Sequence, residues 1–348
     1  AAGNDRRAAI VQSITRKLRS DMERLSAIIE RFENLSRNYS SDDVVEKFRR
    51  TGKENTLFVF MEGVIERLRQ LNHSGTAKNY SAALGSFKRF RNNEDIQMEA
   101  IDHILMEDYQ AYLASLGVVP NSISFYMRIL RAVYNRAVEQ ELTIDRNPFR
   151  TVFTGVEKTR KRAISISDIK RIRDLDLSLK PNLEFARNLF LFLFLCRGMS
   201  FIDAAFLKKS DIQSGILTYR RHKTNQVLHI KIIKPIKELV DRYSSNDSPY
   251  LLPIITRPHC DERRQYETAL RRVNKSLKTI AGMVKLPIPL TTYVSRHAWA
   301  TIAKSKNIPV NVISDALGHD SIATTQIYLA SIDTSTIDRA NELIIKDL

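Results

Sequence analysis

The sequence predicts a mainly helical chain with a small β-sheet, an α+β fold. The segment 7–34 and several later ones carry apolar residues at steps of three and four, which is the period of one helix face. Two short runs, 217–219 and 227–232, are rich in β-forming residues and flank the polar stretch 222–225, as in a hairpin. The 348 residues suffice for two domains, or three.

The N-terminal part of the chain predicts helices joined by polar loops. We expect one helix over 7–34 and a loop over 34–43. A compact helical unit follows, in which either Asn121 or Ser122 is expected to cap the last helix. Its expected helices span residues 56–71, 76–90, 106–116 and 121–140.

The composition changes after Asn147-Pro148. Residues 157–162 form a basic run without apolar periodicity, which predicts an extended linker, and Ser167 and Asp168 indicate a helix start beyond it. The apolar stretch 182–196 predicts a buried element, and further helices are expected over 235–244, 262–281, 295–306 and 309–317. We therefore divide the chain into 1–45, an N-terminal helical segment; 50–150, a helical domain; 151–165, a basic linker; and 166–348, a second domain.

The net charge of +16 is concentrated in the second half of the chain. Residues 1–150 carry 23 basic and 20 acidic side chains, whereas residues 151–348 carry 32 and 19. Such an excess favours a polyanionic partner, most often nucleic acid. A membrane surface is disfavoured because the chain shows no lipidation motif, no span-length apolar run and no interfacial helix with a basic face. Cys196 and Cys260 match no metal-ligand pattern and favour a reducing compartment.

Side chains able to act on a phosphodiester gather near the C-terminus. They lie in Leu290-Thr-Thr-Tyr-Val-Ser-Arg-His-Ala-Trp-Ala-Thr301, Leu317-Gly-His319 and Thr324-Thr-Gln-Ile-Tyr328. Cleavage without a metal needs fixed cations around the non-bridging oxygens, an acid for the leaving oxygen and a nucleophile. The sequence has no metal-binding HExxH motif, no paired acidic cluster like that of two-metal nucleases and no glycine-rich nucleotide loop.

The order and spacing of these motifs resemble the C-terminal signature of tyrosine recombinases, also called phage-type integrases. The resemblance extends over roughly residues 50–335. It implies that Tyr328, nine residues after His319, attacks DNA and forms a 3′-phosphotyrosyl bond. It also implies that Arg296 clamps the scissile phosphate, that His319 donates a hydrogen bond to it, and that Lys223 protonates the leaving 5′ oxygen.

Two positions depart from the family pattern. Tyr293 stands where the family usually has histidine, and its phenol could donate a hydrogen bond to the phosphate. When Asp203 is matched to the family's acidic residue, expected to orient its neighbours, Ser200 falls where the first arginine belongs. We expect Arg197 to restore the missing guanidinium, with Ser200 donating from its hydroxyl, and Arg187 is the alternative donor. The segment 197–203 resembles integrases of Bacteroides-type mobile elements.

The resemblance also assigns roles to the domains. Residues 50–150 would be the core DNA-binding domain, residues 166–348 the catalytic domain, and residues 1–45 an arm-binding or connecting piece. Phosphate contacts are expected from the helical domain and the linker, at Lys78, Lys88, Arg89, Arg91, Arg128, Arg131, Lys158, Arg160, Lys161 and Arg162.

The family's activity gives a full set of expectations. The chain would integrate or excise a mobile element, without a cofactor, as a homo-tetramer on duplex DNA aided by DNA-bending accessory factors. We expect it in the bacterial cytoplasm, at the nucleoid. Two alternatives stay open: a type IB topoisomerase-like relaxase, and a lapsed recombinase that only binds and bends DNA.

Overall fold

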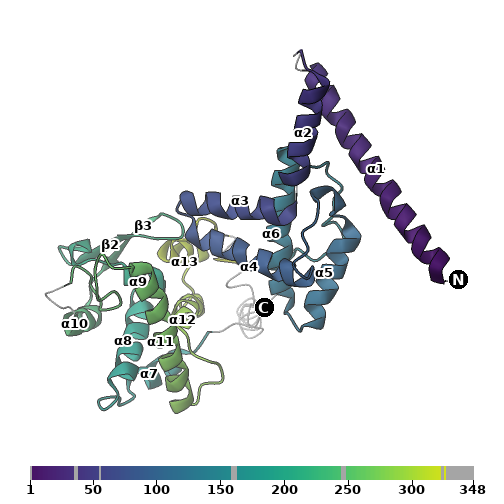
Figure 1. The fold of residues 1–348 in the computed structure, drawn as a ribbon. Helices are drawn as coiled ribbons and strands as arrows, with labels where there is room; N and C mark the ends of the chain where they lie inside the picture. Colours follow the sequence, from purple (N-terminus) through teal and green to yellow (C-terminus); the bar gives the residue numbers. More distant parts are fainter. Residues whose placement is uncertain are drawn as a thin grey trace, which may run out of the picture. The chain divides into compact units, whose positions relative to one another are not determined.

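The computed structural model describes residues 2–34, 38–54, 56–157, 163–243, 248–322 and 325–326. Its contacts divide the chain into two compact units, Ala1–Thr159 and Arg160–Leu348 (Figure 1). The described residues are mostly helical and include one small sheet. The prediction of a mainly α fold with a small β-sheet is therefore confirmed. None of the described helices is both long and apolar enough to cross a lipid bilayer.

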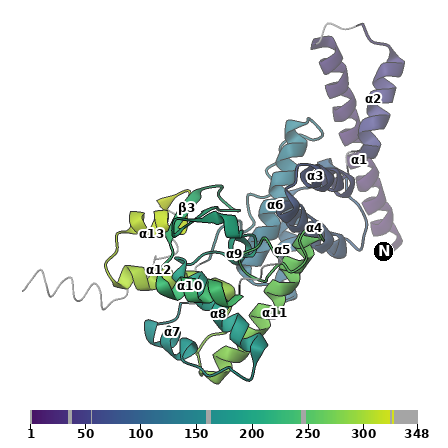
Figure 2. The same cartoon turned by 90° about the vertical axis from the view of Figure 1, so that its left-hand side faces the viewer.

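The first unit begins with two long helices, α1 (Ala2–Asn34) and α2 (Ser41–Glu54), which lie side by side (Figures 1 and 2). The loop expected over 34–43 is wrong from residue 41 onward. The backbone N–H of Ser40 donates to Asp43 Oδ2 at 2.8 Å, and the N–H of Asp43 donates to Ser40 Oγ at 3.2 Å. This reciprocal capping satisfies two otherwise unpaired donors and starts the helix despite its polar composition.

Four helices form the compact part of this unit: α3 (Leu57–Gln70), α4 (Ser74–Phe90), α5 (His103–Ser115) and α6 (Pro120–Glu139), with a 3₁₀ turn at Met98–Ala100. Their apolar faces meet in one core that contains Met61, Phe87, Tyr109 and Met127, each fully buried. The Tyr109 hydroxyl donates to Ser86 Oγ at 2.8 Å, so the buried phenol keeps a partner.

The expected cap of α6 at Asn121 or Ser122 is wrong. Val119 is the N-cap residue and Pro120 occupies the first turn, where its missing N–H costs nothing and its fixed φ suits a helix. The Asn121 side chain instead bonds both backbone groups of Glu157, accepting from its N–H at 2.8 Å and donating to its carbonyl at 3.0 Å.

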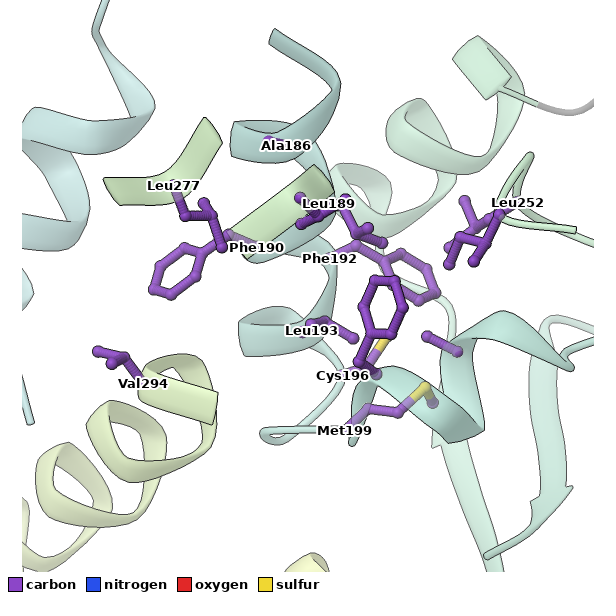
Figure 3. Packing of buried hydrophobic residues seen from close by; sticks show 14 of the residues in the cluster. Ala186, Leu189, Phe190, Phe192, Leu193, Cys196, Met199, Leu252, Leu277 and Val294 are labelled. Atoms are coloured by element: carbon purple, nitrogen blue, oxygen red, sulfur yellow. The ribbon is translucent and has the colours of Figure 1, made fainter. Parts of the chain in front are cut away.

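Helix α8 (Pro181–Leu195) is the centre of the second unit. It contacts α7 (Ile166–Arg173), α10 (Lys234–Tyr243), α11 (Glu262–Met283) and α12 (Thr292–Ser305). In Figure 3, Phe190 lies on the side of Leu277 and Val294, and Phe192 lies on the side of Leu252. A helix that packs on several sides must be apolar on most of its surface, which explains the unbroken run of Leu and Phe.

The sheet is a three-stranded antiparallel ribbon in the order β1 (Ile212–Gln213), β2 (Ile216–Arg220) and β3 (Val227–Lys231). Tyr219 pairs with Leu228, and the inward positions of β2 are Leu217 and Tyr219. The turn after β2 is hydrogen-bonded to Gly318, the residue after α13 (Val310–Leu317). Figure 2 shows α13 close to β3. These two segments and the short helix α9 (Phe201–Ala205) surround the site described next.

Candidate active site

The chain reverses sharply after α8. Arg197 and Gly198 both have positive φ, 59° and 70°, which ends the helix and turns the backbone toward α12. A Cβ on Gly198 would lie 2.8 Å from the Cα of Arg296, so glycine is required for this approach. The turn thereby presents the carbonyl of Gly198 to the Arg296 guanidinium.

Arg296 is buried on α12, with 4% of its surface exposed. Its Nη1 donates to the Gly198 carbonyl at 2.9 Å, and its Nη2 donates to the Leu317 carbonyl at 2.5 Å. Carbonyls from two separate segments therefore fix the plane of the guanidinium.

A second buried guanidinium belongs to Arg221, which directly follows β2 and is 6% exposed. Its Nη1 donates to the carbonyl of Gly318, and its Nε lies 4.0 Å from Asp203 Oδ2. Within the part of the chain that the structure describes, this buried Nε–H has no hydrogen-bond partner. Sequence reasoning missed Arg221, although the alternation that turns Leu217 and Tyr219 inward places residue 221 on the same face.

Asp203 is a buried carboxylate on α9. It accepts from Ser200 Oγ at 2.6 Å, from the His222 backbone N–H at 2.9 Å and from His222 Nδ1 at 3.2 Å. Burial opposes ionisation of this carboxyl, but the hydrogen bonds from His222 and Ser200 outweigh burial and lower its pKa. An ionised Asp203 thus holds Ser200 and His222, the residue that follows Arg221.

Lys223 is exposed in the turn between β2 and β3. The turn closes through hydrogen bonds between Arg221 and residues 225 and 226, from Arg221 N–H to the Gln226 carbonyl at 2.8 Å and from Asn225 N–H to the Arg221 carbonyl at 2.9 Å. Thr224 Oγ1 donates to the Gly318 carbonyl at 3.1 Å. The hairpin turn is thereby tied to the residue before His319.

His319 lies among these cations. Burial, and then the charges of Arg296, Arg221 and Lys223, lower its pKa to about 4 from an ordinary value of 6.5. Its Nδ1 is 2.7 Å from the hydroxyl oxygen of Thr325. The imidazole is therefore neutral near pH 7.

The depressed pKa of His319 predicts a pH-dependent stability. Between about pH 6.5 and pH 4 the unfolded chain binds a proton at this residue and the folded chain does not, so the free energy of unfolding should fall as the pH falls. Urea titrations across this range should show a shallower dependence for His319→Gln, which cannot take up the proton. Equal slopes in the two proteins would contradict the assignment.

The other expected residues are distributed as follows. The Ser200 hydroxyl donates to Asp203 and accepts from the Asp203 N–H, as the N-cap of α9. The Arg187 guanidinium donates to the carbonyls of Leu175 and Arg173 and to Asn188 Oδ1, beside α7. Tyr293 is 53% exposed, and its ring centroid is 4.6 Å from that of His297.

The expected phosphate contacts of the first unit occupy varied surroundings. Lys88 pairs with Glu62 at 2.6 Å, Arg131 donates to Thr154 Oγ1 at 3.3 Å, and Arg128 donates to the Ser124 carbonyl at 3.4 Å. Exposed positions are Lys78, Arg89, Arg128 and Arg131. Arg91 is half-buried. Five expected residues lie outside the described part of the chain: Tyr328, Lys158, Arg160, Lys161 and Arg162.

Comparisons with known proteins agree over most of the chain. Residues 56–157 match the phage integrase SAM-like domain, and residues 167–334 match the phage integrase family. The tyrosine recombinase XerA of Pyrococcus furiosus is 27% identical over 244 residues, which are 68% of this chain and 79% of that protein.

Two solved structures share the fold. A lambda integrase dimer bound to a COC′ core site has a TM-score of 0.61 at 18% identity, covering 87% of this chain and 85% of that one. A lambda integrase tetramer bound to a Holliday junction has a TM-score of 0.60 at 17% identity, with the same two coverages of 87% and 85%.

Proposed function

The chain belongs to the phage integrase family of tyrosine recombinases and is a site-specific DNA recombinase, and from this premise we propose how its own residues carry the reaction. The cluster of Arg296, Arg221 and His319, which we call the phosphate pocket, would hold the scissile phosphate. Tyr328 would attack the phosphorus, and Lys223 would protonate the leaving 5′ oxygen.

One observation carries this assignment: two buried guanidiniums flank one histidine. Arg296 donates to the carbonyl of Leu317 and Arg221 to that of Gly318, the two residues that precede His319. Buried charge is costly unless a partner compensates it. Asp203 also serves Ser200 and His222, so it offsets only part of the charge of Arg221. A phosphate dianion-like transition state would add negative charge beside the two guanidiniums.

Arg221 is our candidate for the guanidinium that the family's first arginine supplies. Its guanidinium charge acts on His319, and its buried Nε–H has no hydrogen-bond partner among the described residues, so the bond to Gly318 does not use all of its donors. The fallback donor Arg187 already spends its guanidinium on the carbonyls beside α7. Arg197 is half-buried in the turn after α8, and its position supports this role less well than that of Arg221.

Ser200 would act through Asp203, as the cap of α9, and Tyr293 would lie at the edge of the phosphate.

The proposed chemistry conserves the phosphodiester energy. The Tyr328 oxygen forms a bond to phosphorus as the phenol gives its proton to solvent water, and the bond from phosphorus to the 5′ oxygen breaks. The released 5′ hydroxyl takes its proton from the Lys223 ammonium, in the hairpin turn that Thr224 ties to the Gly318 carbonyl. The 3′-phosphotyrosyl link can then be attacked by another 5′ hydroxyl, so rejoining needs no nucleotide cofactor.

Duplex DNA would be the substrate, and four copies would act together. The basic excess of residues 151–348 suits a DNA backbone. The similar lambda integrase was solved as a tetramer on a Holliday junction. We further propose that the chain integrates or excises a mobile element, of the type found in Bacteroides, at the bacterial nucleoid. Exposed basic residues of the first unit, Lys78 and Arg89 among them, would contact phosphates, as would the linker residues 158–162.

A trapping experiment tests this function without knowledge of the target site. A pool of nicked duplexes with randomised sequence releases a short 5′-hydroxyl strand after cleavage, so the protein stays linked to the remaining strand. We expect a covalent adduct that survives denaturing electrophoresis, and sequencing the trapped strands would give the site. DNA binding without any adduct would overturn the proposal and indicate a lapsed recombinase.

The site found in this way separates recombination from simple relaxation. A supercoiled plasmid carrying two copies of the selected site should yield deleted or inverted products. Relaxed plasmid without joined products would instead indicate a type IB topoisomerase-like activity.

A further inference from the structure

A buried hydroxyl touches the histidine of the proposed phosphate pocket. Thr325 is fully buried, and its Oγ1 lies 2.7 Å from His319 Nδ1. It belongs to the helical residues 325–326, three positions before Tyr328 in the sequence. The proposed chemistry does not involve this contact, which gives Nδ1 of His319 a hydrogen-bond partner.

The contact admits two hydrogen arrangements. A neutral imidazole carries one N–H and one bare nitrogen, while a threonine hydroxyl can donate or accept. If Nδ1 carries the proton, His319 donates to Thr325 and Nε2 is left as a lone pair. If Thr325 donates, Nδ1 accepts and the proton lies on Nε2.

The surroundings of His319 favour a neutral imidazole, and the two neutral arrangements interact with an anion in opposite ways. Burial and the cations Arg296, Arg221 and Lys223 disfavour a doubly protonated ring. A bare Nε2 facing a phosphate oxygen would set two lone pairs against each other. An Nε2–H would instead donate to that oxygen.

We propose that Thr325 is a positioning residue: its hydroxyl donates to His319 Nδ1 and thereby keeps the proton on Nε2, where it can bond the scissile phosphate. This inference rests on the proposed function for the role of His319 but not for the hydrogen bond itself. The same contact ties the segment leading to Tyr328 to the anion pocket. A merely structural hydroxyl would have no effect on which ring nitrogen carries the proton.

The tautomer can be measured on the full chain without DNA. The ¹⁵N chemical shifts of the two ring nitrogens distinguish the neutral tautomers, and the His319→Gln spectrum identifies the His319 signals among the seven histidines. Near pH 7 we expect the Nε2–H tautomer in the wild type and in Thr325→Ser, and a mixture in Thr325→Val. A wild-type ring protonated on Nδ1, or an unchanged spectrum in Thr325→Val, would overturn the inference.

Single-turnover cleavage of the nicked duplex that trapping selects provides the second readout. Thr325→Val keeps the side-chain shape and removes the hydroxyl, so adduct formation should slow about tenfold, the effect of one hydrogen bond, with DNA affinity unchanged. Thr325→Ser should restore the rate. If valine and serine variants both react at the wild-type rate, the positioning role is wrong while the recombinase assignment stands. The absence of an adduct in the wild type would instead reject the proposed function.

Discussion

Replacing Arg221 with alanine should slow adduct formation by about 10²–10³-fold, the usual cost of removing one donor from a site that stabilises developing charge. The side chain is buried, bonds the Gly318 carbonyl and has a buried Nε–H that no described residue uses. Single-turnover trapping on the selected duplex measures the rate. Arg221→Lys should recover only part of it, because an ammonium keeps the charge but lacks the planar fork.

Arg197→Ala is the matched control for that substitution. Arg197 lies in the turn after α8, three residues before Ser200, and is the residue that we first expected to restore the missing guanidinium. We expect its alanine variant to cleave at nearly the wild-type rate. The reverse result, with Arg197→Ala inactive and Arg221→Ala active, would return the role to Arg197.

Folding must be controlled because Arg221 is also a structural partner of Asp203. Thermal denaturation and DNA affinity of Arg221→Ala should be compared with the wild type before the rate is interpreted. Added methylguanidinium offers an independent readout. It should partly restore cleavage by Arg221→Ala if it enters the space left by the arginine side chain, and it should not affect the wild type.

The fold class followed from the sequence because periodicity reports which face of an element is buried. Apolar residues at helical steps predicted α1, α3, α4 and α6, and the run of Leu and Phe predicted the buried helix α8. Helix α2 was missed because its polar composition gives little apolar signal, while its start depends on the local Ser40–Asp43 cap. Local capping chemistry thus sets where α2 begins, as the cap between Ser200 and Asp203 does for the short helix α9.

The site could be predicted only where it is local in sequence. Arg296 and His319 come from compact motifs, and the fold brings the Arg296 guanidinium to the Leu317 carbonyl, where its charge acts on His319. Arg221 joins them through strand alternation and a contact 97 residues away at Gly318, which spacing alone does not reveal. The course of the chain at Arg197 depends on two successive residues with positive φ, so neither helical nor extended geometry could place that side chain in advance.

Tyr328→Phe should abolish the covalent adduct while leaving DNA affinity and thermal stability close to those of the wild type. The substitution removes one oxygen and conserves the ring, so packing changes little. Without the phenolic oxygen no bond to phosphorus can form, and the cations of Arg296, Arg221 and Lys223 cannot replace a nucleophile.

Tyr39→Phe, a change at an exposed residue of the first unit, is the matched control and should react normally. Digestion of the wild-type adduct and mass spectrometry should find the nucleotide on the peptide that contains residue 328. An adduct that persists in Tyr328→Phe would show that another side chain attacks the DNA, and the roles assigned around His319 would then lose their basis.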